Sequence, residues 1–88
     1  MLVRELYSKY HERFTTLAHT NKSPELAEPE IEMLIAKLRR DLERLPPGDV
    51  DVLKEQLCTQ LEEETLWHPA DQNSRAILSI AAKWVQLA

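Results

Sequence analysis

The chain has 88 residues, of which 43% are hydrophobic and 30% charged, and 11 Lys and Arg against 15 Asp and Glu give a net charge of −4. This composition excludes an intrinsically disordered polypeptide and predicts one small globular domain spanning 1–88. The acidity disfavours a nucleic-acid partner, because phosphate backbones are bound through Lys and Arg.

The residue usage indicates an all-α protein. There is only one glycine, helix-forming Leu, Glu, Ala, Lys and Arg are abundant, and β-branched runs between tight turns are missing. Cys58 is the only cysteine, which excludes an internal disulfide, and the opening MLVRELYSKYHERF carries charges where a signal peptide needs an apolar run. We therefore expect a small bundle of about four helices in a cytoplasmic protein.

The first helix is predicted at about 2–19. Its apolar residues recur at spacings of four and three, which is typical of a helix with one buried face. These residues are Val3, Tyr7, Tyr10, Phe14 and Leu17.

The second helix has two candidate starts, because Pro24 follows the capping residue Ser23 and Pro29 follows five residues later. A proline inside a helix costs about 3 kcal/mol. We therefore place this helix at 29–45 and expect 23–27 to form a loop or a single turn. The buried face would comprise Ile31, Ile35, Leu38, Leu42 and Leu45.

The third helix is predicted at 49–67. The pair Pro46 and Pro47 ends the preceding helix, and Asp49 can cap the next one. Pro69 disfavours helical backbone at the residue before it, so the helix should end near Trp67. Its narrower apolar stripe consists of Val50, Leu53, Leu57 and Leu61.

The fourth helix is predicted at 72–87, with Asp71, Asn73 and Ser74 as alternative caps. From Ala76 to Ala88 only one line of polar residues interrupts its apolar surface, so the helix must be covered on two sides. That line consists of Ser79, Lys83 and Gln86. The apolar stretch is shorter than the roughly 20 residues that span a bilayer, so we expect no membrane span.

Two arrangements would bury the fourth helix: it is the centre of a monomeric bundle, or one face meets a second chain. Trp84 belongs to the core in the first case and to an interface in the second. We place the association face at Trp84, Val85 and Leu87, with Ile77 and Ile80 beside them. Trp67 is a further interface candidate, since exposed tryptophan is enriched at protein interfaces, although it could also pack over the start of the fourth helix.

Metal and catalytic signatures are weak, and we predict no metal, no cofactor and no enzymatic activity. His11 and His19 would lie about 80° apart on a helix and lack a partner at a zinc-ligand spacing. Glu64 and His68 have helical i, i+4 spacing, for which an ion pair or a helix cap is the simpler explanation. They are nevertheless the residues a small helical enzyme would use.

A nucleic-acid-associated regulator is the alternative that the second helix suggests. It would use Lys37, Arg39, Arg40 and Arg44, which are interleaved with acidic residues, as on a solvated helix face. Because apolar surface is plentiful, we instead expect a non-catalytic protein-binding module: an adaptor, a co-chaperone or a small regulator. Its partner would be a second copy of the chain or a different protein.

Overall fold

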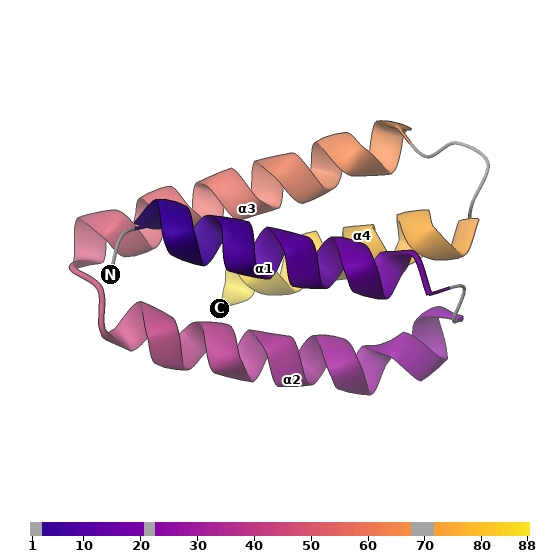
Figure 1. Cartoon of the computed structure of the whole chain (residues 1–88), viewed down its shortest axis with the longest axis horizontal. Coiled ribbons are helices and arrows are strands. Elements are labelled where there is room, and N and C mark those ends of the chain that lie inside the picture. The colour runs from indigo at the N-terminus through magenta and orange to yellow at the C-terminus, as the bar shows by residue number, and fades with distance from the viewer. Residues whose placement is uncertain (1–2, 21–22, 68–71) are drawn as a thin grey trace.

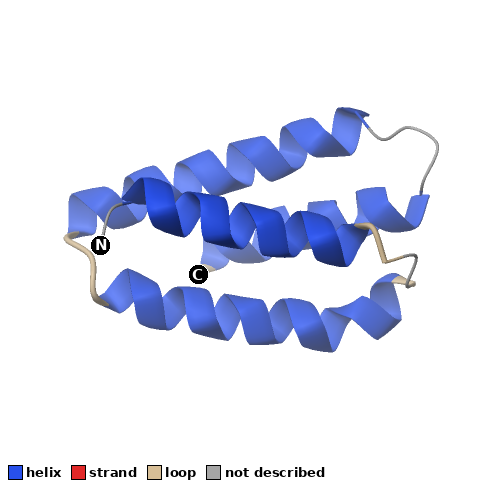
Figure 2. Ribbon diagram, in the orientation of Figure 1, coloured by secondary structure: helices blue, strands red, loops and turns tan. Residues whose placement is uncertain are grey.

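The computed structural model describes residues 3–20, 23–67 and 72–88. Within these ranges every regular element is a helix, and the four helices are α1 (Val3–Ala18), α2 (Pro24–Glu43), α3 (Pro47–Trp67) and α4 (Gln72–Leu87) (Figure 1, Figure 2). The prediction of a small all-α bundle is confirmed. Among the described helices, none is both long enough and apolar enough to cross a membrane.

The four helices lie side by side, and each runs opposite to the one before it (Figure 1). α1 and α4 each pack against all three other helices, whereas α2 and α3 share little direct contact. The C-terminal helix is therefore central within the chain, as the sequence predicted for one of its two arrangements, and α1 shares that position.

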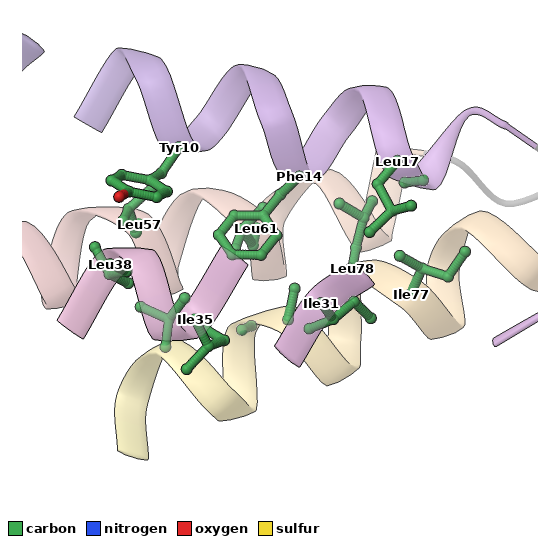
Figure 3. Packing of buried hydrophobic residues seen from close by; sticks show 14 of the residues in the cluster. Tyr10, Phe14, Leu17, Ile31, Ile35, Leu38, Leu57, Leu61, Ile77 and Leu78 are labelled. Carbon is green, nitrogen blue, oxygen red and sulfur yellow. The ribbon is translucent and has the colours of Figure 1, made fainter. Parts of the chain in front are cut away.

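The core is built from one apolar face of each helix. Tyr10 and Phe14 of α1 point into the space between the helices, near Leu57 and Leu61 of α3 and Leu38 of α2 (Figure 3). Each of these five side chains is at most 1% exposed. The buried residues also include Leu6, Leu17, Ala18, Ala27, Ile31, Ile35, Leu42, Leu53, Ile77, Leu78, Ala81, Ala82 and Val85.

The start of α2 differs from the prediction. The helix begins at Pro24 and continues through Pro29, so the predicted start at residue 29 is wrong. The Ser23 carbonyl accepts hydrogen bonds from the N–H groups of Leu26 and Ala27, each at 3.1 Å. Ala27 is fully buried, so packing against the core holds this first turn. Pro29 lies on the exposed face and still leaves one helical hydrogen bond unmade.

The start of α3 also lies earlier than predicted. Pro47 is the first helical residue, and the Pro46 carbonyl accepts the N–H groups of Asp49 at 3.0 Å and Val50 at 3.1 Å. Asp49 is therefore inside the first turn and is not the cap. Proline suits this first position because the N–H it lacks would have no partner in the helix.

Of the three predicted caps for α4, Asp71 lies outside the described residues. Asn73 and Ser74 lie inside the helix, which begins at Gln72, so neither is the cap. Ser74 is buried instead, and its hydroxyl donates to the carbonyl of Ala18 at 2.6 Å. This bond ties the start of α4 to the end of α1, where backbone carbonyls lack helical partners.

Candidate functional site

A groove with an apolar floor runs between α2 and α4. It has a volume of about 340 Å³ and is lined by Glu32, Ile35, Ala36 and Arg39 of α2 and by Trp84 and Leu87 of α4. Leu87 is 70% exposed and Trp84 is half-buried, so an apolar side chain from outside could contact both. We call this set of six residues the α2–α4 groove.

Helical spacing explains why these residues share one groove. Trp84 and Leu87 are three positions apart and project from the same side of α4, as residues at i and i+3 do. Glu32 and Arg39 are seven positions apart on α2, so they lie about two turns, or roughly 10 Å, from each other along the helix. The groove thus has an apolar centre with one acidic and one basic end.

The structure divides the predicted association face on α4. Ile77 and Val85 are fully buried in the core and are not accessible to another chain. Ile80 and Trp84 are half-buried at the edge of the core, and only Leu87 is largely exposed. The buried pair faces the helices of its own chain, because α4 is covered on more than one side.

The side chain of Trp67 lies outside the described residues, and so does His68. The predicted interface role of Trp67 and the predicted pairing of Glu64 with His68 therefore both involve side chains outside the described ones. Glu64 does have a partner, but it is a residue of α1.

That partner is His11, for which the sequence suggested only a pairing with His19. The His11 Nε2 atom lies 2.5 Å from Glu64 Oε1, and the His11 ring stacks on Tyr7 with an 8° interplanar angle. Glu64 Oε2 is buried without a hydrogen-bond partner. Burial and the nearby Glu64 and Glu63 carboxylates raise the pKa of Tyr7. A groove between α1 and α3 is lined by Tyr7 but by neither His11 nor Glu64. The His11–Glu64 pair joins α1 to α3.

A second polar contact joins α1 to α2. The Tyr10 hydroxyl donates to Asp41 Oδ2 at 2.5 Å, while Lys9 lies 3.6 Å from the same oxygen and 5.2 Å from the centre of the Tyr10 ring. Burial first, and then the hydrogen bond to Asp41, raises the pKa of Tyr10 well above its ordinary value. The contact spans 31 positions, and no local pattern in the sequence marks it.

The four basic residues of the nucleic-acid alternative are all exposed, but they do not form one face. Lys37, Arg40 and Arg44 share a side of α2, whereas Arg39 projects about 160° away from Lys37. Lys37 lines the groove between α1 and α2, where Glu12 and Glu30 accompany the cations, and Arg39 lines the α2–α4 groove. The four predicted basic residues therefore do not form one continuous stripe for a phosphate backbone.

The Cys58 thiol and possible metal ligands were the other candidates for reactive chemistry. Cys58 is half-buried and its thiol donates to Glu62 Oε1 at 3.4 Å. Burial, followed by the hydrogen bond and charge of Glu62, raises the pKa of this thiol, which opposes nucleophilic reactivity. In the part of the chain that the structure describes, no three His, Cys, Asp or Glu side chains converge on a possible metal position.

Comparisons with protein-family models, with curated proteins and with solved structures give no match. The function therefore has to be argued from the residues of this chain.

Proposed function

We propose that the protein is a non-catalytic protein-binding module and that its recognition surface is the α2–α4 groove. The observation that carries this proposal is the position of Leu87, which is 70% exposed beside the half-buried Trp84 and next to Ala36 of α2. A tryptophan with one face packed and the other accessible is the kind of anchor that contributes most to protein interfaces.

The polar side chains with the closest contacts support a binding role over a catalytic one, because their contacts stabilise the fold. The His11–Glu64 and Tyr10–Asp41 contacts each join two helices and therefore stabilise the fold. The raised pKa of Cys58 disfavours its thiolate. Each of these groups thus has a structural role, whereas no described residue covers the exposed Leu87 side chain of the groove.

The test compares two neighbouring substitutions. Leu87→Glu places a charge in the α2–α4 groove, and Gln86→Glu places the same charge on the side of α4 that faces α3. Both positions are exposed, so both variants should fold with the wild-type circular dichroism spectrum.

We expect the wild-type chain and Gln86→Glu, each tagged before Met1, to retain a stoichiometric protein partner, whether a second copy or a different chain. Leu87→Glu should lose that partner. If capture is the same for both variants, or if the wild-type chain retains nothing, the groove is not a protein-binding surface.

A further inference from the structure

We infer that the occupant of the α2–α4 groove is a second copy of the same chain, related by a two-fold axis that crosses α2 near Ile35 and Ala36. This inference rests on the proposed protein-binding function and names its partner. The argument comes from the charges at the two ends of the groove and from the apolar residues between them.

The two end charges lack ion-pair partners in the part of the chain that the structure describes. Glu32 and Arg39 are both exposed and both line the groove, and neither forms an ion pair with a described residue. Their signs balance, so the groove favours neither a strongly acidic nor a strongly basic partner. A partner that pairs with both ends presents a basic group to Glu32 and an acidic group to Arg39.

A second copy meets this requirement when the two α2 helices cross antiparallel. Glu32 of one copy then faces Arg39 of the second copy. Because both copies contribute the same surface, the two-fold axis also places Arg39 of the first copy against Glu32 of the second. The point midway between positions 32 and 39 falls between Ile35 and Ala36. Ala36 is exposed and has only a methyl group, so it would let the two helices approach closely at the crossing point.

The apolar residues of α4 would enlarge this contact. Trp84 and Leu87 of each copy lie beside the crossing point and would be shielded from water by the other copy. A stable interface buries about 800 Å² per partner. That area is about one seventh of the 5687 Å² surface of the chain, so one side of the bundle could supply it.

One feature of the arrangement opposes association. Glu28 lies one turn before Glu32, and Glu43 lies one turn after Arg39, so Glu28 would approach Glu43 of the second copy. Both residues are exposed and neither lines the groove. Repulsion between exposed charges is small in water, so it would weaken the dimer without preventing it.

The experiment is sedimentation equilibrium of charge-reversed variants. Wild-type chain should dimerise, and Glu32→Arg and Arg39→Glu should each weaken the dimer by about tenfold or more, because each places like charges together twice. An equimolar mixture of these two variants should form a heterodimer of wild-type strength, since all its end charges are again opposite. Glu12→Arg and Lys37→Glu make the same charge changes outside the groove and should leave the dimer unchanged.

The inference is overturned if the wild-type chain is a monomer throughout, if neither reversal weakens the dimer, or if the mixture of the two reversed variants fails to associate. Its failure can be told apart from failure of the protein-binding function. A monomeric chain that still captures a different protein, and loses it on Leu87→Glu, would exclude only the second copy.

Discussion

Pro29→Ala is expected to stabilise the protein, and the sign of this effect tests how α2 begins. Pro29 lies inside α2 and has no N–H for the carbonyl of Glu25, four residues earlier. Proline costs about 3 kcal/mol relative to alanine in a helix interior, and the greater freedom of the unfolded alanine chain offsets about 1 kcal/mol. Residue 29 is exposed, so no packing is lost. The net gain should be about 2 kcal/mol, or roughly 10 °C in Tm for a domain of this size.

Pro24→Ala provides the matched control. Pro24 is the first helical residue, where proline is favourable, so its replacement should lower stability by about 0.5 kcal/mol. Urea titrations followed by circular dichroism would measure both changes. If Pro29→Ala is neutral or destabilising, the helix begins at Pro29 and the first turn of α2 does not exist.

Three further contacts give predictions of their own. Tyr10→Phe removes the hydrogen bond to Asp41 and should cost about 1.5 kcal/mol at neutral pH. Because the pKa of Tyr10 is raised in the folded protein, its contribution is complete below the unfolded value of about 10 and is lost progressively as the pH rises from there towards the higher folded-state pKa. Urea titrations should therefore show a steeper alkaline loss of stability for wild type than for Tyr10→Phe, and equal slopes would contradict the pKa shift. Ser74→Ala removes the bond to Ala18 and should cost about 1 to 2 kcal/mol; an unchanged Tm would mean that the two helix ends are not joined this way. Cys58 should react with iodoacetamide more slowly in the native protein than in urea, and equal rates would show that its thiol is neither buried nor hydrogen-bonded.

The sequence was sufficient for the fold class because each helix repeats its apolar residues at spacings of three and four. Phe14 and Leu17 of α1, and Leu57 and Leu61 of α3, are buried as that pattern predicts. The predicted starts of α2 and α3 were too late because each was placed from the local effect of proline alone. The burial of Ala27, which favours an earlier start of α2, depends on tertiary packing. Pro47 occupies the first position of α3, where a helix tolerates proline.

The site was only partly predictable. Trp84 and Leu87 of the predicted association face line the α2–α4 groove, but periodicity alone could not show that Ile77 and Val85 face the core, since α4 is apolar on several sides. Contacts between distant positions left no local signal. His11 lies 53 positions from Glu64, so their pairing depends on how α1 packs against α3.

Photo-crosslinking from α4 would test most directly whether the α2–α4 groove binds a second copy of the chain. A benzophenone-bearing amino acid is placed at position 87, inside the α2–α4 groove, or at position 86 on the other side of the same turn. We expect a covalent dimer from position 87, with the crosslink in the groove of the second copy, and little product from position 86. Equal yields from both positions, or no product from position 87, would contradict it.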